Sequence, residues 1–316
     1  MNVSVIVPVW GVEKYIERCA RSLFEQSLDS IEFIFVNDCT PDKSIEILND
    51  VISDYPHRYD NIKILHHDKN KGLPEARQTG VKASTGDYII HCDSDDWVDR
   101  CLYEKMYALA VKDDLDVAVC QMKETDGNEM YDITLFPDAD KANITNSISD
   151  WLNEGSLCNK MFKRAVYKND IVTPVGAMAE DKCMVLQLIY YCKRIGLVTD
   201  YNYYIWKNPT SIIRLRTEDR VFKNFQEGVE NYKIVEDFYK KHGALDQFQE
   251  AFFDFKYIIR NNLRSLIGNR KYYKVWMSTF PELNKGLLFN KRLPLKQRVR
   301  CILIKYRLFP LPWRRK

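Results

Sequence analysis

The stretch Tyr88-Ile89-Ile90-His91-Cys92-Asp93-Ser94-Asp95-Asp96 joins a short apolar run to three carboxylates within four residues. The run has the length and composition of a buried strand. Ligands of open α/β sheets bind beyond the carboxyl ends of the strands, which is where this acidic cluster falls. Three neighbouring carboxylates repel one another unless a cation neutralises them, and Mg²⁺ and Mn²⁺ prefer oxygen ligands. Taken alone, the stretch predicts either a solvated acidic turn that caps the next helix, which is the commoner case, or a divalent-metal site.

The sequence around this stretch alternates strand and helix signals over about 120 residues. Short β-branched or aromatic runs predict strands, and apolar residues at helical spacing predict helices. The expected strands are 3–9, 31–36, 62–65, 88–92 and 117–121, and the expected helices are 13–26, 42–51, 74–82 and 102–112. Strands that alternate with helices over short loops imply a parallel sheet with right-handed crossovers. We therefore expect an α/β fold with a mostly parallel sheet flanked by helices.

The pattern changes after residue 121, and we expect three parts in all: 1–121, 122–215 and 216–316. The segment 123–149 is polar with little periodicity, so it is expected to be an irregular connection. A helix is expected near 182–191 and an aromatic strand at 201–206, and residues 217–280 are expected to be mostly helical.

The composition is that of a globular protein, and the balance of charges argues against a nucleic-acid partner. With 46% hydrophobic and 29% charged residues, the chain is not of the disordered class. The 47 basic and 44 acidic residues nearly cancel, so we expect no nucleic-acid partner. Nine cysteines occur without a Cys-x-x-Cys pair, which favours a reduced, cytoplasmic compartment over a disulfide framework or a zinc site. No leader of the signal-peptide type and no membrane span are expected.

Three further motifs precede the acidic cluster, each at a junction of the expected sheet. Pro8-Val9-Trp10 ends the first strand, Asn37-Asp38 ends the second, and residues 70–77 (Asn-Lys-Gly-Leu-Pro-Glu-Ala-Arg) open a helix. Together with the cluster, these motifs resemble the nucleotide-sugar-binding half of family 2 glycosyltransferases, which have a GT-A fold. The family's opening strand follows roughly V-S-V-I-V-P-x-x-N-x-E-x-Y-I, and this chain has Gly11 at the Asn position. The resemblance covers residues 3–121.

The resemblance implies how the nucleotide half of a donor would be bound. Asp38 would accept a hydrogen bond from the imide N–H of the base, with a helix cap near Asp42 as the alternative role. Arg77 and the turn at Gly72 would face the diphosphate, because a guanidinium offers several donors; the alternative is a surface arginine. The residues expected at the donor are Pro8, Val9, Glu13, Asp38, Asn70, Gly72, Arg77, Asp93, Ser94 and Ser211.

The resemblance also assigns the acidic cluster. Asp93 would hold the ribose, and Asp95 would bind the Mn²⁺ or Mg²⁺ that bridges the diphosphate. Asp96 would either orient the sugar or support the loop. Relatives often carry a His before Pro-x-Ser as a further ligand, and this chain has Asn208 there. Ser211 and Arg214 would then be diphosphate contacts on a closing loop.

The second part carries a candidate base. Ala179-Glu180-Asp181 begins an apolar helix, and the family motif usually has Gly before the Glu-Asp pair. The family's base falls on Asp181, with Glu180 beside it, because a sugar hydroxyl must lose its proton as it attacks. The alternative is a pair of first-turn acids favoured by the helix dipole. Residues 158–164 resemble the family's N-K-L-[FY] segment, which places Lys160 on the acceptor side.

These motifs favour an inverting, metal-dependent glycosyltransferase, of the hexosyl or N-acetylhexosaminyl type. The donor expected is a nucleotide-diphosphate sugar, with UDP as the nucleotide. The acceptor expected is a hydroxyl of a glycan or a lipid-linked glycan, in bacterial surface polysaccharide synthesis. A sugar-phosphate nucleotidyltransferase is one alternative, but Trp10-Gly11-Val12 replaces the Gly-rich signature of that class. A non-catalytic nucleotide-sugar-binding protein is the other.

The tail 291–316 contains ten Lys or Arg and no Asp or Glu. A helix from Leu295 would align an apolar stripe between basic residues, which suits an anionic membrane surface. The stripe would consist of Leu295, Val299, Ile302, Tyr306 and Phe309. We therefore expect a cytoplasmic protein with a peripheral position on the inner face of the cell membrane. The alternative is a helix packed on the protein with its charges in water.

Overall fold

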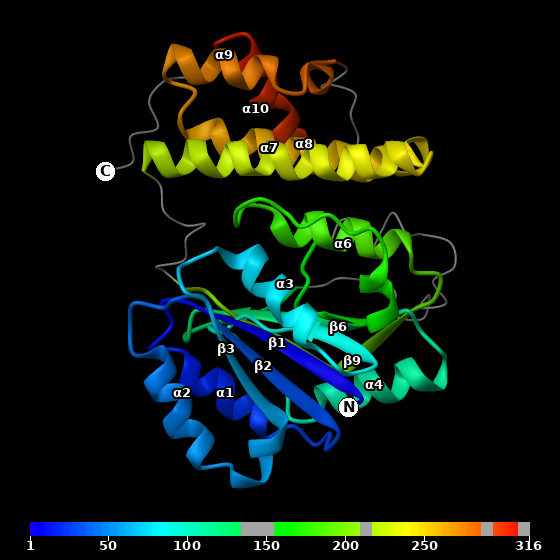
Figure 1. Ribbon diagram of the computed structural model, residues 1–316. Coiled ribbons are helices and arrows are strands. Elements are labelled where there is room, and N and C mark those ends of the chain that lie inside the picture. Colours follow the sequence, from blue (N-terminus) through cyan, green and yellow to red (C-terminus); the bar gives the residue numbers. More distant parts are fainter. Residues whose placement is uncertain (134–154, 209–216, 286–292, 309–316) are drawn as a thin grey trace. The chain divides into compact units, whose positions relative to one another are not determined.

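One sheet runs through the first two thirds of the chain, with the strand expected at 3–9 close to its middle (Figure 1). The computed structural model describes residues 1–133, 155–208, 217–285 and 293–308. The chain divides into two compact units, unit 1 (Met1–Ser211) and unit 2 (Ile212–Lys316). The parts expected at 1–121 and 122–215 thus share one body.

The strand order within the described residues of unit 1 is β3-β2-β1-β4-β8-β6-β9-β5, and β7 pairs with β6. Strands β1 to β4 are mutually parallel, whereas β8 is antiparallel to both β4 and β6. The strands are β1 Val3–Val9, β2 Ile31–Asn37, β3 Ile62–His66, β4 Tyr88–His91, β5 Trp97–Val98, β6 Val117–Thr125, β7 Met130–Ile133, β8 Lys160–Lys163 and β9 Ile195–Trp206. The helices of unit 1 are α1 Ile16–Phe24, α2 Ser44–Ser53, α3 Leu73–Ala83, α4 Leu102–Lys112 and α6 Glu180–Tyr190. This mixed α/β sheet confirms the expected fold class.

Helices cover both faces of the sheet (Figure 1). The odd-numbered valines of β1 point to the face covered by α1, and Ile6 points to the face covered by α3. Gly80 lies where α3 crosses β1, and a Cβ at this position would come within 2.3 Å of the Ile6 side chain. Only glycine permits such a close approach of the two backbones. Gly80 therefore allows α3 to pack directly on β1.

The segment expected to be irregular at 123–149 is a hairpin in its described part, so that expectation was wrong there. Strand β6 continues to Thr125 and turns at Gly127, whose φ is +95°, into the antiparallel strand β7. Lys123 and Asp132 face each other across the pair, with Nζ and Oδ1 3.5 Å apart. The charged residues of this hairpin interrupt the alternation of apolar and polar residues that predicts a strand. They are paired across the two strands, and the local sequence does not show this pairing. Residues 134–149 lie outside the described residues.

Unit 2 is helical where the structure describes it, as the sequence predicted for 217–280. Its helices are α7 Glu218–Lys241, α8 Gln249–Asn262, α9 Arg270–Ser278 and α10 Leu295–Lys305. Aromatic rings form much of its core, with the Tyr232 ring edge-on to Phe255 and to Phe280. Arg260 is buried with its guanidinium carbon 4.2 Å from the centre of the Trp276 ring.

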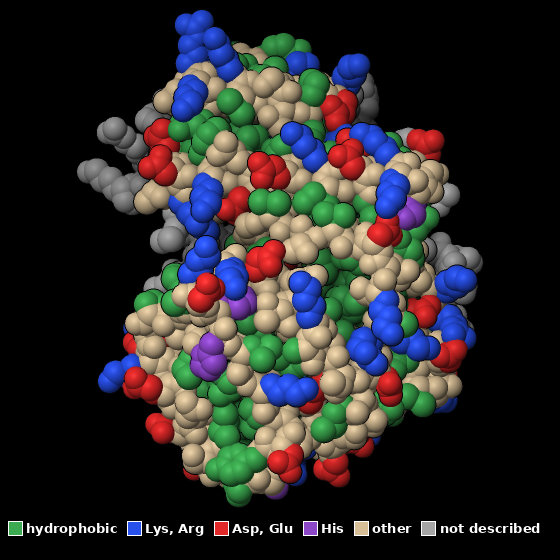
Figure 2. Space-filling view, in the orientation of Figure 1, with side chains coloured by type: hydrophobic (Ala, Val, Ile, Leu, Met, Phe, Trp, Pro, Cys, Tyr) green, Lys and Arg blue, Asp and Glu red, His purple; other side chains and the backbone are tan. Residues whose placement is uncertain are grey.

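The apolar length of the helices and the distribution of surface charge show whether membrane spans or patches of charge of one sign are present. No helix among the described residues is long and apolar enough to span a bilayer. Acidic and basic side chains are interspersed over the face of unit 1 shown in Figure 2.

All nine cysteines are free thiols, with Cys19 and Cys92 Sγ atoms 4.0 Å apart.

The buried carboxylate of Glu32 joins strand β2 to both neighbouring strands, β1 and β3, and to the loop before β4. Glu32 on β2 accepts hydrogen bonds from Ser4 Oγ at 2.6 Å, from Thr85 N at 2.6 Å and from Lys63 Nζ at 2.7 Å. Burial opposes ionisation, but these donors prevail and lower the pKa of the Glu32 carboxyl from 4.5 to about 2. Ionised Glu32 therefore stabilises the folded state above the unfolded pKa, and this contribution is lost as the pH falls toward 2.

We expect Glu32→Gln to lower the free energy of unfolding by about 1–3 kcal/mol at neutral pH, because the amide cannot satisfy all three donors. The difference from the native protein should shrink between pH 4.5 and pH 2, the interval set by the two pKa values. Denaturant unfolding at several pH values measures it. Lys63→Gln is the control, with a smaller cost, because the Lys63 side chain is 41% exposed. A Glu32→Gln difference independent of pH would contradict the assignment.

Candidate functional site

The predicted motifs meet at one edge of the sheet, beyond the carboxyl ends of β1, β2 and β4. Asp38 follows β2, and its backbone N–H donates to the carbonyl of Val9 at 3.1 Å. Pro8 and Val9 are buried in β1, opposite Val36 and Asn37 of β2. The acidic cluster follows β4, which pairs with the other side of β1. The parallel strands therefore bring together residues from three separate motifs.

Asp38 anchors the turn that leads into α3. Its carboxylate accepts hydrogen bonds from the backbone N–H of Lys71 at 2.7 Å and of Gly72 at 2.8 Å, and His67 Nδ1 lies 2.7 Å away. Gly72 has a φ of +91°, which favours glycine. The buried Asp38 side chain thus has both oxygens bound to the protein, which the sequence analysis did not foresee.

The alternative role considered for Asp38, capping the next helix, is wrong. Asp42 accepts from the backbone N–H of Ser44 at 3.1 Å and so supports the start of α2. Asp42 also accepts from the N–H of Glu13, while the exposed Glu13 carboxylate accepts from the N–H of Lys43. These bonds join the loops after β1 and β2. Asn70 is exposed in the loop before α3.

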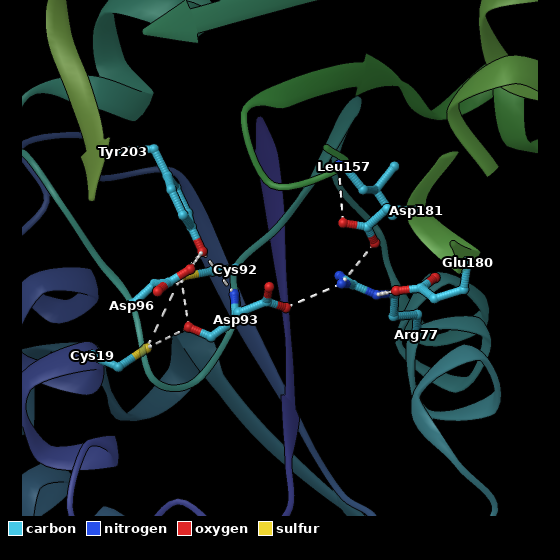
Figure 3. Close-up of polar contacts among 9 residues, drawn as sticks. All are labelled: Cys19, Arg77, Cys92, Asp93, Asp96, Leu157, Glu180, Asp181 and Tyr203. Atoms are coloured by element: carbon cyan, nitrogen blue, oxygen red, sulfur yellow. Dashed lines mark hydrogen bonds and ion pairs between the residues drawn. The ribbon is translucent and has the colours of Figure 1, made fainter. Parts of the chain in front are cut away.

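Asp96 supports the acidic loop, one of the two roles expected from the sequence. Its side chain is buried and accepts hydrogen bonds from Tyr203 Oη at 2.8 Å and from the N–H of Trp206 at 2.7 Å. Tyr203 Oη in turn accepts from the N–H of Asp93 at 2.9 Å (Figure 3). The acidic loop is therefore fastened to β9 at two points.

Asp95 lies between two polar neighbours. The amide Nδ2 of Asn208 donates to Asp95 Oδ2 at 3.0 Å, and Arg18 donates to the Asp95 carbonyl at 2.7 Å. Burial raises the pKa of the Asp95 carboxyl, and the charge of Asp93 adds to the effect. Ser94 is buried between the two acids. Burial and Asp93 thus disfavour the ionised form of Asp95 relative to a free carboxyl, and a nearby cation would act in the opposite direction.

Arg77 is the centre of the site. The alternative of a surface arginine is wrong, because only 3% of Arg77 is exposed. Its Nη2 lies 3.0 Å from Asp93 Oδ1 and 3.0 Å from Asp181 Oδ1, and its Nε lies 3.0 Å from Glu180 Oε1 (Figure 3). Arg77 therefore joins the acidic cluster to the candidate base.

Three carboxylates around one guanidinium leave an excess of negative charge. Burial and the charge of Asp181 raise the pKa of the Glu180 carboxyl well above its ordinary value, against the opposing effect of Arg77. Burial acts against the charge of Arg77, but the three acids raise its pKa well above its ordinary value. Arg77 therefore remains a cation, and burial disfavours the ionised form of Glu180.

Asp181 is held in place yet partly open to solvent. It lies in the first turn of α6, after Ala179, whose φ of +62° explains why relatives favour glycine there. Besides the Arg77 contact, Asp181 Oδ2 accepts from the N–H of Leu157 at 3.4 Å. The Asp181 side chain is 30% exposed, whereas Glu180 is buried. Only Asp181 of this pair can meet an incoming hydroxyl.

The turn that contacts Asp181 is itself fixed by a buried cation. Lys160 is fully buried and donates to the Ser156 carbonyl at 2.7 Å and to Asn159 Oδ1 at 2.9 Å. Asn159 also donates to the Cys120 carbonyl of β6 at 3.1 Å. Lys160 therefore shapes the backbone beside the base.

His91, next to the acidic cluster, is a buried strand residue whose Nε2 lies 3.1 Å from Tyr167 Oη. Ser211 and Arg214 lie outside the described residues. Within the described part of the chain, no group of three or more His, Cys, Asp or Glu side chains could by itself hold a metal ion.

Comparisons with known proteins show which family the chain belongs to. The chain is 28% identical over 277 residues to the uncharacterized glycosyltransferase EpsJ of Bacillus subtilis, which covers 84% of this chain and 77% of EpsJ. It is 27% identical over 209 residues to the poly(ribitol-phosphate) beta-N-acetylglucosaminyltransferase TarS of Staphylococcus aureus, covering 65% of this chain and 35% of TarS.

Two solved structures share the fold. The crystal structure of S. aureus TarS 1-349 in complex with UDP-GlcNAc superposes with a TM-score of 0.61 at 21% identity, over 98% of this chain and 92% of that one. The mannosyltransferase PcManGT from Pyrobaculum calidifontis, in complex with GDP-Man and Mn²⁺, gives 0.57 at 13% identity, over 100% and 88% of the two chains. The model of glycosyl transferase family 2 matches residues 4–170, more than half of the sequence. The chain belongs to glycosyl transferase family 2, and it is a glycosyltransferase.

Proposed function

We propose that this enzyme transfers a sugar, with inversion, from a nucleotide-diphosphate donor to a hydroxyl of a glycan or lipid-linked glycan. The observation that carries the proposal is Asp181, a partly exposed carboxylate fixed by Arg77 and by the N–H of Leu157. Through Arg77, Asp181 is connected to Asp93 of the acidic loop. A base positioned beside the donor-binding loop is the arrangement that a direct displacement requires.

The chemistry assigned to Asp181 is proton removal from the acceptor. As the acceptor oxygen forms its bond to the anomeric carbon, its proton passes to an Asp181 oxygen. The bond between the anomeric carbon and the diphosphate oxygen breaks, and the nucleoside diphosphate leaves with the bonding electrons. Arg77 keeps its proton throughout, because the three surrounding acids raise its pKa. Its role is to hold Asp181 and Asp93 at fixed positions.

A divalent metal ion fits the acidic loop. The raised pKa of Asp95 reflects burial and the repulsion of Asp93, both of which a cation would relieve. Asp95 would hold Mn²⁺ or Mg²⁺, and Asn208 would offer its amide oxygen after rotation of the side chain. Magnesium sites commonly use one or two carboxylates together with substrate phosphates and water. The ion would neutralise charge that develops on the diphosphate as it departs.

We assign donor binding to residues 1–121 and acceptor binding to 122–215, whose described part carries Lys160 and Asp181. UDP is the proposed nucleotide, and a hexose or N-acetylhexosamine is the proposed sugar, by analogy with TarS, whose structure contains UDP-GlcNAc. Donor contacts are proposed for Pro8, Val9, Glu13, Asp38, Asn70, Gly72, Asp93, Ser94 and Ser211. Arg77 remains a proposed diphosphate contact, and its contacts with Asp93, Glu180 and Asp181 add a positioning role.

The poly(ribitol-phosphate) transferase named above supports a bacterial surface polymer as the acceptor class. A lipid-linked acceptor would require a position at the inner face of the cell membrane, and we include this peripheral, cytoplasmic location in the proposal. Hydrolysis or thermal stabilisation across a panel of nucleotide sugars, with and without Mn²⁺, tests the donor. A nucleotidyltransferase would instead release pyrophosphate from a nucleoside triphosphate, and a non-catalytic protein would bind the donor without turnover.

Asp95→Ala is expected to abolish the gain in UDP affinity that Mn²⁺ provides, because the diphosphate then lacks its bridging cation. Isothermal titration calorimetry with and without Mn²⁺ measures the gain directly, without reliance on activity. The exposed Asp50→Ala variant on α2 is the control and should behave as the native protein. Equal Mn²⁺-dependent affinities in the native protein and Asp95→Ala would refute the metal assignment.

Arg77→Lys is expected to lower kcat by about 100-fold, and by more than it raises the donor KM, because one ammonium cannot hold three carboxylates in place. Arg77→Met should also lose about 3–5 kcal/mol of stability by leaving buried acids unpaired. Steady-state kinetics and thermal unfolding separate the two effects.

Arg58→Lys is the matched control, because buried Arg58 donates only to backbone carbonyls of residues 24–28. It should lose stability while kcat of the folded enzyme stays near the native value. If Arg77→Lys behaved in the same way, Arg77 would be structural and not a positioning residue.

Asp181→Asn keeps the side-chain shape but removes the base, and we expect sugar transfer to fall by about 100-fold or more. Donor affinity by calorimetry should remain close to the native value, since Asp181 receives the acceptor proton. Asp200→Asn, at an exposed position of β9, provides the control. Transfer at the native rate in Asp181→Asn would show that another group accepts the proton.

A further inference from the structure

Helix α10 is attached to the rest of unit 2 by one face only. Cys301 and Ile304 are buried on this face, and Cys301 packs with Leu293 against Phe253 and Tyr257 of α8. At the end of the helix, Tyr273 Oη donates to the Lys305 carbonyl at 2.8 Å. These contacts fix which side of α10 faces away from the unit.

The apolar stripe expected from the sequence lies on the opposite face, so it is not the packing face. Leu295, Val299 and Tyr306 are 62%, 42% and 61% exposed. Their spacing of four and seven residues places them in one line along the helix. Ile302, at the edge of this line, is half-buried against the α8 contact, and Phe309 lies outside the described residues. We name Leu295, Val299 and Tyr306 the outward stripe.

Cations lie beside the outward stripe. At 100° per residue, exposed Lys296 is next to the stripe and Arg300 lies farther round on the same side. On the other side Arg298 is half-buried, and Lys305 Nζ donates to the Asn284 carbonyl at 3.2 Å. The segment 291–316 contains no acidic residue that could neutralise them. Long basic side chains can extend past an apolar line toward anionic groups.

We propose that the outward stripe of α10 docks on a bilayer that contains anionic lipids. The apolar side chains would enter the interface between headgroups and acyl chains, and the flanking cations would contact lipid phosphates. Each basic residue near an anionic surface contributes modestly, so the stripe and its flanks must act together. Docking of this face requires neither donor nor acceptor, so its failure leaves the transfer reaction unaffected.

Co-sedimentation of the full chain with vesicles tests this surface. The vesicles are phosphatidylcholine alone or phosphatidylcholine mixed with phosphatidylglycerol. Leu295→Ser with Val299→Ser removes apolar area, and Lys296→Gln with Arg300→Gln removes charge. The controls carry the same substitutions on α4 and α8, at exposed positions. They are Val111→Ser with Ile258→Ser, and Lys105→Gln with Lys112→Gln.

The native chain should bind mixed vesicles more tightly than neutral ones, and added salt should weaken that binding. Each α10 variant should lose about tenfold or more in its partition coefficient on mixed vesicles. Its thermal transition should not change, because the altered side chains are outside the buried face. The control variants should bind as the native chain does.

Native-like vesicle binding by both α10 variants would overturn the proposal, as would a native chain that does not bind mixed vesicles. Light scattering tests whether a second copy of this chain, and not a bilayer, binds the outward stripe. A dimer that Leu295→Ser with Val299→Ser dissociates, in a chain without affinity for vesicles, would assign the stripe to a second copy of this chain instead.

Discussion

The site depends on one buried guanidinium. Arg77 cannot leave its charge unpaired in the interior, so carboxylates must come to it from the end of β4 and from the start of α6. Arg77 is placed by features of α3 itself: the turn at Gly72 held by Asp38, and the close approach to β1 allowed by Gly80. The same contacts that satisfy a buried cation therefore set the distance between the donor-side loop and the base.

The three aspartates of the acidic loop have different hydrogen-bond partners. These partners suggest a different role for each aspartate. Asp96 is buried and bound to Tyr203 and to the N–H of Trp206, which favours a role in supporting the loop. Asp93 is bound to Arg77, and Asp95 to the amide of Asn208, whose oxygen lies 3.4 Å from Tyr15 Oη. The proposed metal is placed at Asp95 because the family resemblance assigns it there and because its carboxylate, unlike that of Asp93, is bound to a neutral amide and not to Arg77.

Much of the fold could be predicted from sequence because period and turn chemistry are local. The strands and helices of the first 120 residues follow their predicted spans within a few residues. The contacts of Arg77 could not be predicted in this way, since its partners lie 16, 103 and 104 residues along the chain. The motifs named Arg77, Asp93 and Asp181 but not the contacts among them. Strand β7 was missed for a related reason, because its charges are balanced only across the hairpin.

Helix α10 marks a different limit, because periodicity gives the spacing of a stripe but not the side on which it packs. Residues 291–316 hold ten of the 47 basic residues and none of the 44 acidic ones, so the rest of the chain has seven more acids than bases. A near-neutral total thus conceals a strongly basic segment, and total charge is a poor guide to the partner of a single surface. Charge alone would suit any polyanion. The apolar line between the cations is what favours a bilayer, because lipid offers both phosphates and a hydrocarbon interior, whereas a nucleic-acid backbone presents phosphates over sugars.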